Sequence, residues 1–128
     1  MAWRYYAGNK YGNHKVTVDG ELFDSKREAS RWLELKMLEK AGKISGLQRQ
    51  KKFELIPAQY EADIIGPRGG KKKGKLLERE ASYYCDFYYF DEEEKKFIIE
   101  DTKGVRTPEY VLKRKMMLYT YGIVIREV

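Results

Sequence analysis

The sequence predicts a fold of the α/β or α+β class. A central mixed sheet is flanked by helices, and the elements follow one another along the chain in the order α, β, β, β, α, β. Two segments place apolar residues at helical spacing between a capping residue and a glycine. Several runs rich in aromatic and β-branched residues have the length of strands. The last strand follows the second helix, and a crossover of this kind favours a locally parallel pair of strands.

Length and composition indicate one soluble globular domain. The 128 residues are 42% hydrophobic and 36% charged, which separates the chain from disordered proteins. No apolar run approaches the ~20 residues that span a bilayer, and the N-terminus has no apolar signal-peptide core. The single Cys85 and single His14 exclude an internal disulfide, a cysteine–histidine zinc site and an HNH-type nuclease centre within one chain. We therefore expect an intracellular protein that is neither secreted nor bound to a membrane.

Positive charge is in excess along the chain. Lysine and arginine total 26 residues against 20 aspartates and glutamates, for a formal net charge of +6. Such an excess favours a polyanionic partner such as DNA. Many basic proteins bind no nucleic acid, so the charge gains weight only in combination with a site.

The N-terminal part predicts an arm and a hairpin. Residues 1–14 mix aromatic, glycine and basic residues without a period and read as a partly ordered arm, ahead of a single domain over 15–128. The pair Asp19-Gly20, between two short runs of strand-forming residues, predicts a two-residue turn in a hairpin over 15–23.

A helix is predicted over 26–41. Ser25 and Glu28 form a capping box, and Gly42 provides a stop. Its apolar stripe consists of Ala29, Trp32, Leu33 and Met37, widened by Leu35 and Leu38.

Three strands are expected next. The first, over 47–56, ends at Pro57 and is followed by a glycine-rich basic run within 61–80, which predicts a flexible loop or the tip of a long hairpin. The segments 81–90 and 96–102 are the second and third strands, joined by the charged turn 91–95.

The C-terminal part predicts a helix and a last strand. Thr107 is the expected N-cap, Pro108 suits the first helical position, and Gly122 ends the helix. Residues 123–128 form a short apolar strand. The apolar stripe of the helix consists of Val111, Leu112, Lys115, Met116 and Tyr119.

The chemistry-bearing pattern lies on the second and third strands. Asp101 and Lys103 are two residues apart, so on a strand they point to the same face. Antiparallel pairing through the turn brings Asp86 close to Asp101. The strict partner of Asp86 is expected near residue 100, so that a bulge or small register shift would place it at Asp101.

Two carboxylates at the edge of a sheet can hold a hard divalent cation through oxygen ligands. Such a cation activates water and neutralises charge on a phosphate, and a lysine on the same face can orient the water and stabilise negative charge. The alternative is an ordinary ion pair between Asp101 and Lys103, because an isolated D-x-K tripeptide is common.

The complete pattern, D…(D/E)-x-K on consecutive strands after a helix that carries a glutamate, resembles that of the PD-(D/E)XK nucleases. The stretches KVTVDGELFDSKREASR, YYCDFYYF and IIEDTKGVRTPEYVLKRKMM look like a phage-encoded family of uncharacterised restriction-endonuclease-like proteins. This resemblance, over roughly 10–128, implies a restriction-endonuclease-like αβββαβ core with a central mixed sheet. It also implies an Mg²⁺- or Mn²⁺-dependent endonuclease that hydrolyses DNA phosphodiester bonds, with junction resolvases and other structure-selective enzymes among its relatives.

The resemblance assigns roles to individual residues. Asp86 matches the first acid of the motif, Asp101 the second acid and Lys103 the lysine; Cys85 stands where the family name has proline. Glu28 matches an acidic residue on the first helix that contacts the metal, unless it serves only as a cap. The backbone carbonyl of Thr102 is implied as a further metal ligand.

Glu100 points away from Asp101 on a regular strand and becomes a ligand only if the strand end twists. Basic residues are expected to contact DNA, although each of them can also be a solvated surface residue. These residues are Lys113, Arg106, Lys71, Lys72, Lys73 and Lys75.

The alternative to a nuclease is a non-catalytic DNA-binding phage protein that retains the nuclease fold. Because a small domain offers one metal site, and two-fold symmetry would supply a second, a homodimer is also expected.

Overall fold

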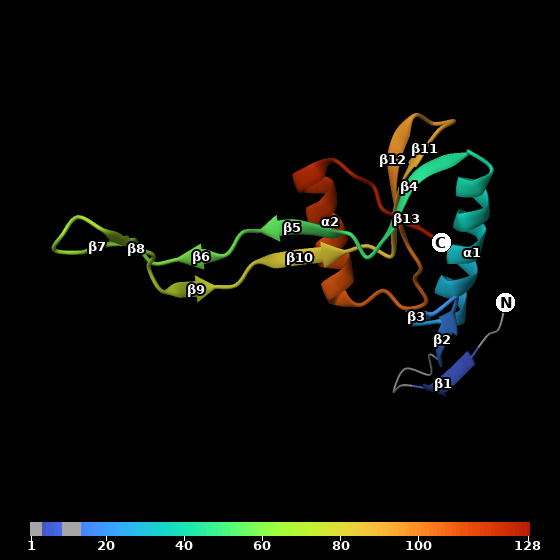
Figure 1. The fold of residues 1–128 in the computed structure, drawn as a ribbon, viewed down its shortest axis with the longest axis horizontal. Helices are drawn as coiled ribbons and strands as arrows, with labels where there is room; N and C mark the ends of the chain where they lie inside the picture. The colour runs from blue at the N-terminus through green and yellow to red at the C-terminus, as the bar shows by residue number, and fades with distance from the viewer. Residues whose placement is uncertain (1–3, 9–13) are drawn as a thin grey trace. The chain divides into compact units, whose positions relative to one another are not determined.

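The protein has a mixed α+β fold, with one mixed sheet, several small antiparallel sheets and two helices in the described part of the chain (Figure 1). The computed structural model describes the backbone of residues 4–8 and 14–128 and the side chains of residues 15–128. This architecture confirms the predicted fold class. Neither described helix is long and apolar enough to cross a membrane.

Contacts between residues divide the chain into two compact units, where the sequence predicted a single domain. The core unit comprises Met1–Lys51, Cys85–Val105 and Ile125–Val128, and the arm unit comprises Lys52–Tyr84 and Arg106–Val124. The chain therefore leaves the core unit twice, once between two neighbouring strands of its sheet and once for the second helix.

The mixed sheet of the core unit has the strand order β13-β12-β11-β4. It consists of β4 (Ile44–Arg49), β11 (Phe87–Asp91), β12 (Lys96–Asp101) and β13 (Arg126–Glu127). The pairs β4·β11 and β11·β12 are antiparallel, whereas β12 and β13 run parallel. The parallel pair that the sequence predicted is therefore confirmed.

Helix α1 (Lys26–Lys40) packs against this sheet (Figure 1). The contact is an apolar cluster that Trp32 and Leu47 border. Its buried members are Leu35 of the helix together with Ile44, Phe87, Tyr89 and Ile98 of the sheet. Met37, expected within the apolar stripe, is instead 73% exposed, because it lies on the side of the helix turned away from this cluster.

A second, three-stranded sheet precedes the helix. It is formed by β1 (Arg4–Gly8), β2 (His14–Val18) and β3 (Glu21–Phe23), paired in that order. The predicted turn between β2 and β3 is confirmed, since Asp19 and Gly20 both have positive φ angles, 51° and 81°. The expected N-terminal arm thus contributes one strand, and its residues 1–3 and 9–13 lie outside the described part of the chain.

Two of the predicted strands are each broken into two. The segment 47–56 divides between β4 and β5 (Lys52–Ile56), and 81–90 divides between β10 (Ala81–Tyr84) and β11. The breaks lie side by side, because the Gln50 backbone N–H donates to the Asp86 carbonyl at 3.1 Å. Gln50 has a φ of 50°, and this backbone conformation turns the chain out of the mixed sheet. Past this point β5 and β10 pair with each other and with no other strand that the structure describes.

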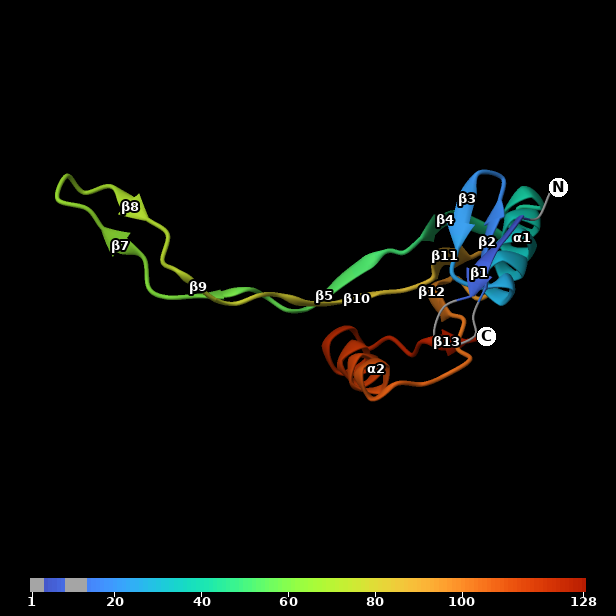
Figure 2. The ribbon, with the colours of Figure 1, turned by 90° about the horizontal axis from the view of Figure 1, so that it is seen from below.

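The arm unit contains one long hairpin. Beyond β5 and β10 it continues as β6 (Gln59–Tyr60) with β9 (Leu76–Glu78) and ends as β7 (Ile64–Ile65) with β8 (Lys71–Lys72). Of the two predictions for 61–80, the tip of a long hairpin is therefore the one observed. Within this unit, α2 (Pro108–Tyr121) packs against β5 and β10, and the tip extends away from it (Figure 2).

The predicted ends of α2 are confirmed. Thr107 accepts a hydrogen bond from the Tyr110 backbone N–H at 3.1 Å, and Gly122 closes the helix with a φ of 68°. The predicted apolar stripe is wrong in part, because Tyr110 and Met117 are the buried residues. Leu112 and Tyr119 are exposed.

Candidate active site

Asp86 and Asp101 lie across from each other at one end of the mixed sheet. Strands β11 and β12 pair without a shift from Asp91 opposite Lys96 to Phe87 opposite Glu100. Extended by one position beyond β11, this register sets Asp86 opposite Asp101. The strict partner expected near residue 100 is therefore off by one position, and no bulge is needed, because the four residues 92–95 separate the last paired positions, Asp91 and Lys96.

The carboxylate of Asp86 is held by the chain that follows β12. Thr102 donates two hydrogen bonds to it, from its backbone N–H and from its hydroxyl, each at 2.7 Å. Both fall on Oδ2, so neither involves Oδ1. The sequence suggested only the carbonyl of Thr102 as a site group; its hydroxyl was not anticipated.

Asp101 is almost fully buried, with 2% of its surface exposed. Lys103 Nζ lies 3.1 Å from Asp101 Oδ1 and remains partly accessible. The two side chains thus share a face, as the two-residue spacing predicts, and they form the ion pair that was the alternative interpretation. The positively charged side chain of Lys103 therefore lies beside a buried carboxylate at the end of β12.

Glu28 belongs to the same region. It lies in the first turn of α1, and the neighbouring Arg27 donates from Nη1 to the carbonyl of Lys103 at 3.3 Å. Glu28 is 3% exposed. Burial, then the negative charges of Asp86 and Asp24, raise the pKa of its carboxyl to about 7.

The cap and site interpretations of Glu28 can now be separated. Its backbone N–H donates to the Ser25 hydroxyl at 3.1 Å, which is the first half of a capping box. Its carboxylate is directed elsewhere, with Oε1 3.6 Å from Arg49 Nη2. Within the described residues, Oε1 accepts no hydrogen bond although it is buried. The carboxylate is therefore turned towards Arg49 and away from the cap.

Arg49 was not anticipated as a site residue. It lies on β4, and its guanidinium stacks over the Phe23 ring at 3.9 Å and donates to the Leu22 carbonyl at 3.1 Å. It partly offsets the negative charge around Glu28. An arginine in a strand carries no sequence signal for this role, because its partners come from two other elements, β3 and α1.

Glu100 has a structural role away from Asp101. Its carboxylate is fully buried and accepts hydrogen bonds from Arg31 Nε at 2.7 Å and Nη2 at 2.6 Å, and another from the Tyr89 hydroxyl. Burial and this hydrogen bond raise the pKa of Tyr89 well above its usual range. The carboxylate of Glu100 faces the helix, so the alternative of Glu100 as a metal ligand finds no support.

The donor set suits a hard divalent cation. Glu28, Asp86 and Asp101 offer carboxylate oxygens, the ligands that Mg²⁺ and Mn²⁺ prefer. The buried Oε1 of Glu28, which lacks a hydrogen bond within the described residues, supports this fit. Among the residues that the structure describes, no three acidic, histidine or cysteine side chains are already grouped at ligand distance. To hold a cation together, the three carboxylates would have to lie closer to one another than they do.

The candidate DNA-binding residues all belong to the arm unit. Lys113 of α2 forms an ion pair with Glu109 at 3.1 Å. The other five are exposed: Arg106 before α2 and Lys71, Lys72, Lys73 and Lys75 near the hairpin tip. Glu28, Asp86, Asp101 and Lys103 belong to the core unit.

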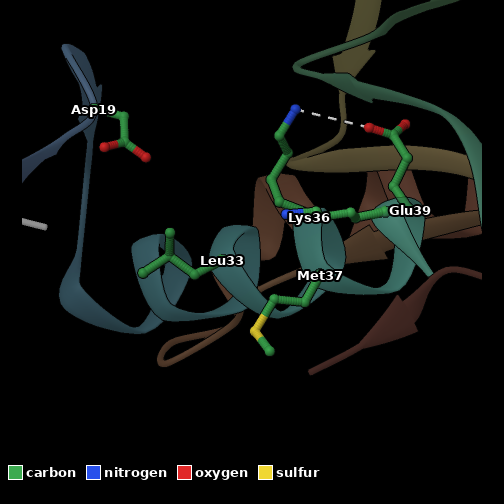
Figure 3. Close-up of a pocket in the computed structure, with 6 residues that line it drawn as sticks. Asp19, Leu33, Lys36, Met37 and Glu39 are labelled. Atoms are coloured by element: carbon green, nitrogen blue, oxygen red, sulfur yellow. Dashed lines mark ion pairs between the residues drawn. The ribbon is translucent and has the colours of Figure 1, made fainter.

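A separate cavity of about 420 Å³ lies on the side of α1 that bears Met37 (Figure 3). It is lined by Leu33, Met37 and the stems of neighbouring polar residues, and Lys36 and Glu39 at its edge form an ion pair at 3.7 Å. None of the candidate site residues contributes to it.

Comparison with known proteins gives one match. No curated protein and no solved structure matches the chain significantly. A family model described as "Protein of unknown function (DUF1064)" matches residues 8–127, which include Glu28, Asp86, Asp101 and Lys103. Because the match spans nearly the whole chain, the protein belongs to the DUF1064 family.

Proposed function

We propose that this protein is a metal-dependent endodeoxyribonuclease of the PD-(D/E)XK kind. The observation that carries the proposal is that Thr102, the residue after Asp101, donates two hydrogen bonds to Asp86, while Lys103 lies 3.1 Å from Asp101. Glu28, in the first turn of α1, is subject to the negative charge of Asp86. A protein that only binds phosphate has no use for buried carboxylates at its binding face, because they repel the ligand.

The order of elements supports the same proposal. Helix α1 is followed along the chain by β4, β11, β12, α2 and β13, and the four strands form one mixed sheet. This order is that of the restriction-endonuclease-like αβββαβ core that the motif resemblance implies. The excursion β5–β10 is an insertion between its first two strands.

Each site residue has a definite task in this proposal. Glu28, Asp86 and Asp101 would hold Mg²⁺ or Mn²⁺, which would supply charge neutralisation at the scissile phosphate and activation of water. Lys103, kept in place by Asp101, donates hydrogen bonds to the attacking water and to the phosphate oxygen on which charge develops. Thr102 fixes the orientation of Asp86.

The test is a cleavage assay on linear, nicked, single-stranded and four-way DNA, with Mg²⁺, Mn²⁺ or a chelator. Asp86→Ala and Lys103→Ala should each lower the rate by on the order of 10²-fold or more. Lys96→Ala, at the exposed opposite end of β12, and Asp63→Asn in the arm are matched controls. Cleavage that persists in chelator, or that both site variants retain, would contradict the proposal.

A non-catalytic DNA-binding protein is the second candidate. The observation that favours it is that both aspartates already have partners within the protein. Asp101 pairs with Lys103, and Asp86 accepts two hydrogen bonds from Thr102. This candidate predicts DNA binding unaffected by divalent cations, no cleavage, and no heat of Mg²⁺ binding in titration calorimetry. The nuclease predicts heat that disappears in Asp101→Asn.

A further inference from the structure

The tip of the long hairpin concentrates positive charge. Residues 64–75 contain five cations and no acidic residue. The cations are Arg68, Lys71, Lys72, Lys73 and Lys75, and all are exposed. The nearest acidic residues in sequence are Asp63 and Glu61 on one side and Glu78 on the other. The tip is therefore a local cationic surface on a chain whose other charges are mixed.

Apolar side chains are exposed at the same tip. Ile64 is 59% exposed and Ile65 is 69% exposed. In the register of β7 and β8, Ile64 stands opposite Lys72 and Ile65 opposite Lys71. Directly opposed residues share a face of an antiparallel pair, so each face presents one isoleucine beside one lysine. A face of this kind suits a ligand that carries both charged groups and apolar surfaces. It suits a purely apolar protein surface less well.

The tip is a narrow two-stranded ribbon. The Gly66 backbone N–H donates to the Gly70 carbonyl at 2.8 Å, and Gly69 has a φ of 81°. At the neck, a Cβ on Gly74 would lie 2.1 Å from the Glu61 carbonyl oxygen, so only glycine allows the strands this close approach. An isolated two-stranded ribbon is marginally stable in water, and the exposed Ile64 and Ile65 add no core to it.

We propose that this tip enters the minor groove of duplex DNA and acts as a bending wedge. The lysines contact phosphates on both sides of the groove, and Ile64 and Ile65 insert at a base step, as apolar wedges of minor-groove proteins do. Opening a base step costs free energy, and the cost is lower where stacking is already interrupted. The tip therefore gives the protein a preference for nicked or branched duplexes over intact ones.

This inference rests on the proposed function only in taking DNA as the substrate. The experiment measures binding in chelator, where cleavage does not contribute, to intact, nicked and four-way DNA that carries a fluorophore pair at its ends. The wedge variant is Ile64→Ser with Ile65→Ser, and the charge variant is Lys71→Ala with Lys72→Ala and Lys73→Ala. Met37→Gln, an equally exposed apolar residue on α1, is the control.

The two variants should change DNA binding in different ways. The charge variant should weaken binding to every DNA and reduce the log–log salt slope by up to about 0.9 per lost phosphate contact. The wedge variant should keep that slope, lose roughly tenfold in preference for nicked over intact duplex, and lose the approach of the DNA ends. The control should behave as the wild type does.

Three results would overturn the inference. They are an unchanged preference and bend in the wedge variant, an unchanged salt slope in the charge variant, and a wedge variant that changes the oligomeric state instead of DNA binding. The proposed nuclease is judged separately by cleavage in Mg²⁺. A protein that bends nicked DNA but never cleaves it would remove the nuclease proposal and leave the wedge.

Discussion

Replacing Glu28 with glutamine should make the protein more stable at alkaline pH and leave it nearly unchanged at acidic pH. Glutamine keeps the size of the side chain and the N–H that donates to Ser25, but it cannot ionise. The wild-type carboxyl has to ionise while buried near Asp86 and Asp24, with only Arg49 to compensate. The variant removes that cost.

The sign and size follow from the pKa of Glu28, which folding raises from 4.5 to about 7. Between these values the folded protein holds a proton that the unfolded chain has released, so stability falls as pH rises through this window. Above pH 7 the loss is complete. At 1.36 kcal/mol per pKa unit it amounts to up to about 3 kcal/mol, which corresponds to roughly 10 °C in Tm for a chain of this length.

The assay is urea unfolding in chelator at pH 4.5, 6 and 8, followed by fluorescence of Trp32, which packs on Phe23 and Phe87 in the core unit. The difference between variant and wild type should grow with pH and then level off. Mg²⁺ at pH 8 should stabilise the wild type more than the variant, because a bound cation favours the ionised carboxylate. A difference that does not depend on pH would refute the reasoning.

Three further outcomes are expected. Asp101→Asn should lower Mg²⁺-dependent cleavage by on the order of 10²-fold without weakening DNA binding in chelator, and an unchanged rate would remove Asp101 from the site. Arg31→Met should cost about 3–5 kcal/mol in urea unfolding because it leaves the buried Glu100 without its cation, whereas a loss below ~1 kcal/mol would contradict that role. Light scattering at micromolar concentration should show a homodimer. One metal site cuts one DNA strand, and a two-fold axis supplies a second metal site for the other strand. A monomer that makes paired, symmetric cuts would refute this last argument.

Local chemistry explains why several elements were predictable. Ser25 and Thr107 each bond to a backbone N–H three residues away, and Gly122 takes the left-handed conformation that ends a helix. The turn at Asp19-Gly20 likewise depends on its own two φ angles. The spacing of Asp101 and Lys103 sets their common face in the same way, so the centre of the candidate site could also be predicted.

Less of the surrounding site was predictable. The apolar stripe of α2 was partly misassigned, because the faces that are buried depend on which partner a helix meets. The role of Glu28 stayed open, because a glutamate in a first turn suits both a cap and a site. Its carboxylate is directed by Arg49 of β4 and by the charge of Asp86, neither of which is close in sequence.

The sequence by itself determined the helix ends, the turns, the parallel last strand and the D…D-x-K spacing, because each depends on residues within a few positions of one another or on the order of elements. Only the tertiary structure decided where the strands break, since Gln50 and Asp86 meet through a hydrogen bond between distant segments. It also decided that Glu100 pairs with Arg31, 69 residues away. Such contacts form only when the chain closes long loops, so their partners are chosen by packing and burial and leave no local pattern to read.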